Sequence, residues 1–318
     1  MTLNPFNLPK ESFNARRDIL LSSMESVITE TSNYIYNDYP NLEKLEQAES
    51  FCKHELMEAP TARVDHLEKV SIFPWVEAVH ELDSCLTVIF QGNYKNAFDS
   101  LRRALELVVA GSFFVLDSTE PEKAKKWMHS VSDNGTPNFK RALSELKKAT
   151  PQYDQDNDES WIDVLLEHYW DICNVIHVNG LENSFNIISP RFRHINGMSV
   201  PQFDNKACSQ SLSYYLKTVE LIALTVALSN PVLLVGFDME RKFGINPPMS
   251  GFYSPVQAEN LACLIPDNFQ KLIARIKETD TNISSIQHWY DSLPDITEEE
   301  LNAQFERQDD FFKEFTKS

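Results

Sequence analysis

The segment NYKNAFDSLRRALELVVAGSFFVL, at residues 93–116, restricts the possible folds more than any other part of the chain. Its apolar side chains recur at steps of three and four residues, which places them along one side of an α-helix. That side consists of Tyr94, Ala97, Phe98, Leu101, Leu105, Val108 and Ser112. The spacing therefore predicts a long amphipathic helix at 92–116 with one buried stripe.

The same periodicity predicts helices along most of the chain. Pro74 lies where a first helical turn would be, a position that tolerates its missing N–H, and Gly92 lies where that helix would end. In addition to the 92–116 helix, we expect helices at about 10–35, 41–58, 71–92, 120–131, 137–149, 158–178, 207–229 and 257–278, and a charged amphipathic tail after them.

One segment departs from the helical pattern. Residues 179–206 contain prolines and an Asn196-Gly197 pair between extended-type residues, a combination typical of a tight β-hairpin. The chain has only 8 glycines in 318 residues, a scarcity that long helices tolerate better than multi-turn β folds. We therefore predict an all-α helical bundle with a small irregular or β-hairpin insertion near 179–206.

The amino-acid composition changes after Pro231, and this change predicts how the chain is divided into domains. The chain then becomes rich in prolines and loops until about residue 256. We expect a main helical bundle at 1–230 and a proline-punctuated helical extension at 231–318 packed on it. The boundary is soft enough that the two could form one domain.

Net charge and cysteine spacing exclude several classes of function. A net charge of −18 repels phosphate backbones, so general nucleic-acid binding is disfavoured. The five cysteines include no CxxC pair, which argues against a zinc knuckle or a disulfide framework. The N-terminal residues do not have the pattern of a signal peptide, and Ser229-Asn230-Pro231 divides the most apolar run into halves too short to span a bilayer. We expect a cytoplasmic protein.

No cofactor or metal site is expected. The sequence has no Walker loop, G-x-G-x-x-G, H-E-x-x-H, EF-hand loop or G-x-S-x-G. Glu77 and His80 have the Glu-x-x-His spacing of di-iron bundles, but that site needs a second copy, and the chain has none.

Two helices carry the polar residues that could form a site. On the 92–116 helix, Arg102 and Glu106 lie one turn apart beside the apolar stripe, while Arg103 points away. Arg102 could hold its guanidinium at the mouth of a groove. The alternative is a structural i,i+4 ion pair whose aliphatic stem packs along the helix.

The second helix is predicted at 158–178. His168 falls at the centre of its apolar face, as expected of a buried imidazole hydrogen-bonded to a neighbour. Tyr169, Cys173 and His177 form a second stripe at four-residue steps, and His177 falls in the last turn. A Cys173–His177 nucleophile pair is sterically possible, but no orienting group or oxyanion site accompanies it.

Two segments together resemble a known group of proteins. GNYKNAFDSLRRALELVVAGSFF and YWDICNVIHVNG resemble poorly characterised bacterial helical proteins, in which one helix carries Leu-Arg-x-x-x-Glu and a later helix carries a tyrosine and a terminal histidine. That group is similar to HEPN-like domains, some of which are metal-independent ribonucleases of toxin–antitoxin and phage-defence systems. The resemblance covers about residues 75–230, and the matching positions are Arg102, Glu106, Tyr169 and His177.

Three hypotheses about function follow. The first is a binding or regulatory module, not an enzyme, in which Arg102, Glu106, Tyr169 and His177 line a groove for a partner segment or a small anion. The resemblance implies a prokaryotic accessory or defence role for it.

The alternative is a HEPN-like ribonuclease with His177 as general base and Arg102 stabilising phosphate charge. The HEPN nuclease signature has an arginine four to six residues before the histidine, and no arginine precedes His177 in its helix. The third hypothesis is a purely structural scaffold. The oligomeric state stays open.

Overall fold

The stripe predicted on the 92–116 helix is buried along its whole length. Helix α5 spans Tyr94–Leu116, and each of the seven stripe residues is at most 1% exposed. The helix is buried because neighbours surround it. It contacts α4 (Ile72–Phe90), α7 (Phe139–Ala149), α8 (Trp161–Ile176) and α10 (Asn205–Ser229).

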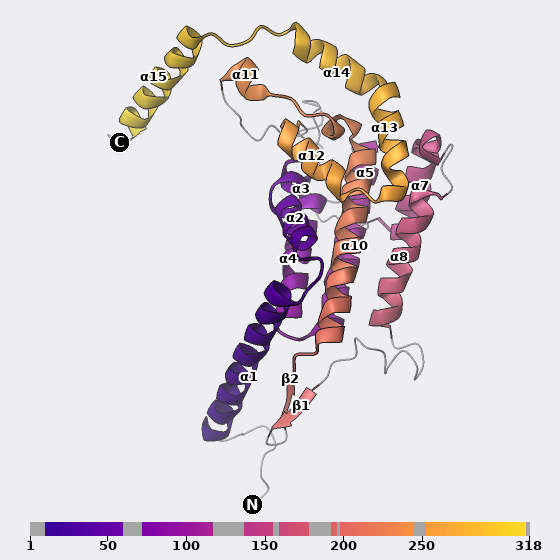
Figure 1. The fold of residues 1–318 in the computed structure, drawn as a ribbon, viewed down its shortest axis with the longest axis vertical. Coiled ribbons are helices and arrows are strands. Elements are labelled where there is room, and N and C mark those ends of the chain that lie inside the picture. The colour runs from indigo at the N-terminus through magenta and orange to yellow at the C-terminus, as the bar shows by residue number, and fades with distance from the viewer. Residues whose placement is uncertain are drawn as a thin grey trace, which may run out of the picture.

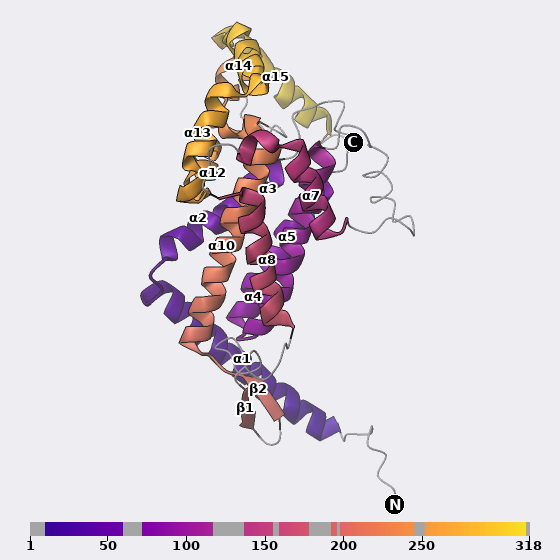
Figure 2. The same ribbon diagram turned by 90° about the vertical axis from the view of Figure 1, so that its right-hand side faces the viewer.

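The computed structural model describes residues 10–59, 72–116, 137–154, 159–177, 192–195, 198–244 and 252–315. Helices α4, α5, α8 and α10 run alongside one another as a bundle (Figures 1 and 2). Helix α1, Lys10–Asn37, extends past the lower end of this bundle. The predicted all-α bundle is confirmed.

Further helices and turns lie between the bundle helices or follow them in the chain. Between α1 and α4 lie α2 (Leu42–Lys53) and α3 (Glu55–Glu58), and 3-10 turns occupy Pro151–Asp154, Pro231–Leu234 and Asp267–Phe269. The C-terminal part contains α11 (Met239–Phe243), α12 (Pro255–Leu264), α13 (Gln270–Thr279), α14 (Thr281–Ser292) and α15 (Glu298–Phe315). Helices α13 to α15 arch over the upper end of the bundle (Figure 1).

The helix ends follow local chemistry. Gly92 has a φ of 72° and ends α4, with the Asn93 N–H bonded to the Val88 carbonyl at 2.9 Å. This left-handed residue followed by a bond to a carbonyl five residues back is a Schellman motif, so the predicted glycine stop is confirmed. Asp204 starts α10 by accepting hydrogen bonds from the backbone N–H groups of Lys206 and Ala207.

Three details of the helix prediction were wrong or missing. The helix expected at 41–58 is interrupted at His54, which separates α2 from α3. The helix expected at 158–178 spans only Trp161–Ile176. Helix α14 was not predicted, although Asp280 starts it by accepting from the N–H groups of Asn282 and Ile283. The helix expected at 120–131 lies outside the described residues.

The predicted hairpin is present. Strand β1, Phe192–Ile195, pairs antiparallel with β2, Met198–Pro201, in a register that places Ile195 opposite Met198. This register leaves the predicted Asn196-Gly197 pair as the connection, and these two residues lie outside the described part of the chain.

The main core extends into the C-terminal part of the chain. One cluster of buried residues joins the bundle helices to Leu233, Tyr253, Leu261, Phe269 and Ile276. Polar contacts follow the same route: the Tyr253 hydroxyl donates to the Glu55 carbonyl at 2.5 Å, and Asn260 Nδ2 donates to Glu55 Oε1 at 2.9 Å. The division at residue 230 stays a prediction, and the two parts share one core.

Helix α10 is long and apolar enough to cross a bilayer. Among the described helices it alone passes that test of length and hydropathy, and 78% of its apolar window is buried inside the bundle. A core helix of this kind meets the same criterion without any membrane, because its apolar residues face other helices.

Candidate functional site

Three of the four predicted site residues form one hydrogen-bonded network between α5 and α8. Arg102 Nε donates to Glu106 Oε1 at 2.9 Å, and the Tyr169 hydroxyl donates to the same oxygen at 2.7 Å. Helix α5 places Arg102 and Glu106 one turn apart, and α8 brings Tyr169 to them from the facing side. Glu106 is therefore the centre of the network.

Packing and charge hold this network in place. The Tyr169 ring stacks on Phe139 of α7, with centroids 3.9 Å apart and planes 18° from parallel. Burial, and then the bond to Glu106, raise the pKa of the Tyr169 hydroxyl, while pairing with Glu106 raises the pKa of Arg102. Tyr169 and Arg102 therefore both stay protonated at neutral pH.

Cys173 lies one turn after Tyr169 and beside this network. It is buried, and burial raises the pKa of its thiol despite the nearby Tyr169 hydroxyl and Arg102. The thiolate is the nucleophilic form of cysteine, so a raised pKa leaves Cys173 unreactive at neutral pH. A buried thiol that stays protonated gives no support to a Cys173–His177 nucleophile pair.

His177 takes no part in the hydrogen-bonded network of the other three predicted residues. It caps the C-terminal end of α8 with an exposed side chain, and its backbone N–H bonds to the Cys173 carbonyl at 2.9 Å. Arg102 is close enough to Cys173 to affect its charge, and His177 lies one further turn, about 6 Å, along α8. The His177 side chain makes no hydrogen bond, ion pair or ring contact with any described residue.

His168 is structural, as the sequence predicted. Its side chain is buried, and its Nε2 lies 2.9 Å from Thr218 Oγ1 on α10. The imidazole also stacks on Tyr214, with centroids 5.7 Å apart. His168 therefore ties α8 to α10 in the core.

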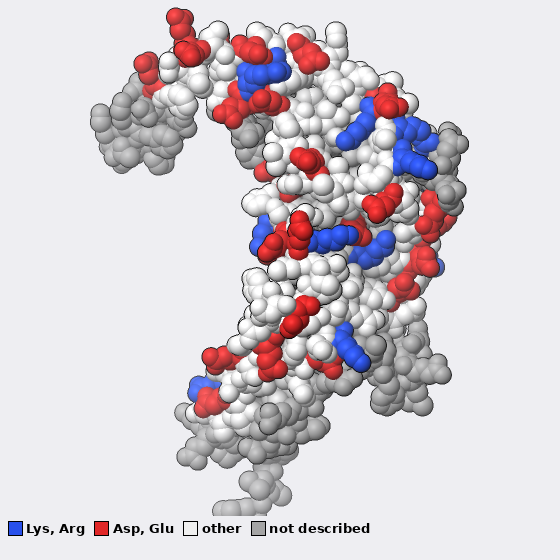
Figure 3. Space-filling view, in the orientation of Figure 1, with Lys and Arg blue, Asp and Glu red and all other residues white. Residues whose placement is uncertain are grey.

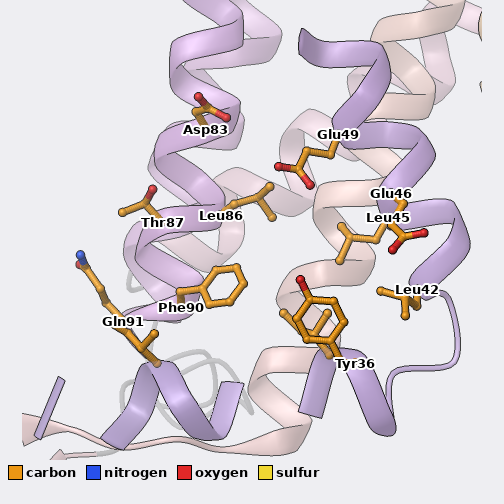
Figure 4. A pocket seen from close by; sticks show the side chains of 12 residues that line it. Tyr36, Leu42, Leu45, Glu46, Glu49, Asp83, Leu86, Thr87, Phe90 and Gln91 are labelled. Atoms are coloured by element: carbon orange, nitrogen blue, oxygen red, sulfur yellow. The ribbon is translucent and has the colours of Figure 1, made fainter. Parts of the chain in front are cut away.

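The structure has a groove between α1, α2 and α4 that the sequence did not predict (Figure 4). Its volume is about 510 Å³. Apolar side chains from all three helices make up most of its wall: Ile28, Ile35, Tyr36, Leu42, Leu45, Leu86 and Phe90. Two of these, Ile28 and Tyr36, are exposed large hydrophobic residues at 39% and 69%.

Acidic side chains border the groove. Glu46 and Glu49 of α2 and Asp83 of α4 belong to its lining, with Glu49 and Asp83 at one end of the view in Figure 4. Lys53 pairs with Glu49 and also interacts electrostatically with Asp83, while Glu46 makes no ion pair within the described residues. Figure 3 shows acidic and basic side chains interspersed on one face of the molecule. An apolar wall with an acidic border favours a ligand that is both apolar and basic.

The sequence contained only a weak signal for this groove. Ile28 and Tyr36 fall on the same amphipathic helix as residues buried by the bundle, so their exposure depends on where α2 and α4 pack. Glu46 and Asp83 are far apart in the chain and line one groove only in the fold. Within the described ranges, no group of three or more His, Cys, Asp or Glu residues is arranged to hold a metal ion.

No protein-family model, curated protein or solved structure matches this chain. The HEPN-like resemblance therefore depends on the two sequence segments that suggested it, and it stays a prediction.

Proposed function

We propose that this chain is a non-enzymatic binding module, and that its ligand is an amphipathic helical segment of a protein, with apolar residues on one face and Lys or Arg beside them. The observation that carries the proposal is the groove between α1, α2 and α4, with its apolar wall and the carboxylate of Glu46, which makes no ion pair within the described residues. Helical segments commonly bind in apolar grooves of this kind.

The Arg102–Glu106–Tyr169 network supports a binding module over a hydrolase. Glu106 accepts hydrogen bonds from both Arg102 and Tyr169. The negative charge of Glu106 and the positive charge of Arg102 therefore balance each other within the network. A ribonuclease would need His177 and Arg102 to act on one phosphate, whereas Arg102 is hydrogen-bonded to Glu106. The network therefore joins α5 to α8 through Glu106 and Tyr169.

The biological setting is part of the proposal. The five cysteines are free, and four of them are buried, which suits a reduced cytoplasm. The resemblance to bacterial HEPN-like proteins adds a prokaryotic accessory or defence role. A small anion at Arg102 is the second ligand class, since its Nη groups make no hydrogen bond with any described residue.

Fluorescence anisotropy with a labelled amphipathic Leu/Lys helix tests the proposal, with a Leu/Glu helix of equal length as the matched probe. We expect the basic probe to bind and the acidic probe not to bind. Glu46→Lys should weaken binding about fivefold, the effect of about 1 kcal/mol for a charge contact at a surface. Glu43→Lys makes the same charge change on exposed α2 outside the groove and should have little effect.

Equal binding of both probes, or equal loss in Glu46→Lys and Glu43→Lys, contradicts the groove as the site. Cleavage of RNA without metal, abolished by His177→Ala in a folded protein, would instead establish the ribonuclease alternative.

A further inference from the structure

A buried carboxyl group lies where the C-terminal part of the chain packs on α3. Glu55 of α3 is only 2% exposed, and its two oxygens are unequally satisfied. Asn260 Nδ2 of α12 donates to Oε1 at 2.9 Å, whereas Oε2 has no hydrogen-bond partner within the described residues. Buried polar side-chain atoms are nearly always hydrogen-bonded, so this oxygen needs a physical explanation.

Two further hydrogen bonds join the same segments. The Tyr253 hydroxyl donates to the Glu55 backbone carbonyl, and Gln257 Nε2 donates to Glu58 Oε2. Each of the three bonds connects residues that are 198 to 205 positions apart in the chain. We call the contact formed by Glu55, Glu58, Tyr253, Gln257 and Asn260 the α3–α12 joint. None of these residues lines the groove, so the joint is independent of the proposed function.

The closest ionisable groups do little to stabilise a charge on Glu55. Burial raises the pKa of this carboxyl above its ordinary value, the hydrogen bond from Asn260 and the nearby His54 oppose that rise, and Glu58 adds to it. The Cys52 thiol of α2 and the Tyr253 hydroxyl also face Glu55. Burial raises the pKa of both groups, so both are uncharged at neutral pH.

Charged side chains of the adjoining helices are exposed or paired elsewhere. Glu49 of α2 pairs with Lys53, and Glu81 of α4 pairs with Arg103 of α5. The exposed ones are Glu43, Lys44 and Glu46 of α2, Glu77, His80 and Asp83 of α4, and Glu259 of α12.

A proton on Glu55 accounts for this environment. A neutral carboxyl group still accepts from Asn260 through Oε1, and it places only a dipole in the joint. An ionised carboxylate would place a full charge there with one donor, which is much more costly in a site that excludes water.

From this geometry we infer that Glu55 makes the α3–α12 joint a proton-sensitive contact, in which α12 docks tightly on α3 while the carboxyl is protonated and is released when it ionises. A carboxyl group that reaches water on release returns to its ordinary pKa of 4.5. The docked state therefore binds the proton more tightly than the released state. Docking is strongest below about pH 4.5 and weakens as the pH rises through the pKa of docked Glu55, by up to about tenfold per pH unit.

A nitroxide spin label on Cys263 of α12 tests the inference in the full chain, because the other four cysteines are buried. We expect the mobility of the label to rise from pH 5 to pH 8.5 in the wild type. Glu55→Gln keeps an acceptor for Asn260 but cannot ionise, so its label should keep the low mobility of pH 5 throughout. Glu259→Gln makes the same change on the exposed side of α12 and should follow the wild type.

The wild-type chain alone tests the sign of the effect. Protonation of the buried His168 destabilises the bundle as the pH falls, so it cannot produce mobility that rises with pH. Carbon-13 NMR of chains labelled at the glutamate carboxyl, with Glu55→Gln to assign the resonance, should show Glu55 titrating above pH 4.5. Wild-type mobility that stays constant or falls with rising pH, an equal rise in Glu55→Gln, or titration of Glu55 at or below pH 4.5 overturns the inference.

Discussion

His168 makes the stability of the bundle depend on pH. Burial, and to a smaller extent Lys217, lower the pKa of His168 from 6.5 to about 4. The folded state therefore binds this proton less tightly than the unfolded state. The contribution of neutral His168 is fully present above about pH 6.5 and is lost as the pH falls toward 4.

The expected loss is about 3 kcal/mol of unfolding free energy across that window. Urea unfolding at pH 7.5, 6 and 5 measures the unfolding free energy. This free energy should decline less with falling pH for His168→Gln than for the wild type, because glutamine cannot gain the proton. His80→Gln, at an exposed position of α4, should decline in parallel with the wild type. If His168→Gln also declines in parallel, the imidazole does not control acid sensitivity.

At the scale of the elements, Glu106 couples α5 to α8. Glu106→Gln removes the charge that Arg102 and Tyr169 both contact and should cost about 1–2 kcal/mol of unfolding free energy. Tyr169→Phe should cost about 1 kcal/mol in the wild type and much less in Glu106→Gln, because the hydroxyl has then lost its charged acceptor.

A double-mutant cycle by chemical unfolding measures this coupling. Tyr290→Phe is the control: its hydroxyl donates to the Asp238 carbonyl at 2.7 Å in a separate cluster, so its cost should add to that of Glu106→Gln. Additive effects of Glu106→Gln and Tyr169→Phe would show that the network does not join the helices energetically.

At the scale of the whole molecule, Gly236 lies where the C-terminal part joins the common core. A Cβ atom at this position would lie 2.2 Å from Pro255 Cα, so no side chain fits. Gly236 also bridges to Tyr253, which is fully buried in the main core. Gly236→Ala should therefore cost on the order of 2–3 kcal/mol.

Because the two parts share this core, they should unfold in one transition, and Gly236→Ala should lower the urea midpoint of that transition. Hydrogen exchange followed in urea should show residues 72–116 and 252–292 losing protection together. Glu259→Ala, on the exposed side of α12, should leave the transition unchanged. Loss of protection in 252–292 well before 72–116 would mean that the C-terminal part is an independent domain.

The sequence by itself determined the helical class, the buried stripe of α5, the stop at Gly92, the hairpin and the buried role of His168. These features depend on contacts between residues close in the chain or on periodicity along one element, which a single sequence records. The i,i+4 pair of Arg102 and Glu106 is local in the same sense.

Tertiary structure alone decided which side chains of different helices meet. Tyr169 meets Glu106 because α8 packs on α5, and the groove exists because Ile28, Glu46 and Asp83 come from three helices. Such contacts depend on how helices align side by side, and periodicity along one helix does not specify that alignment.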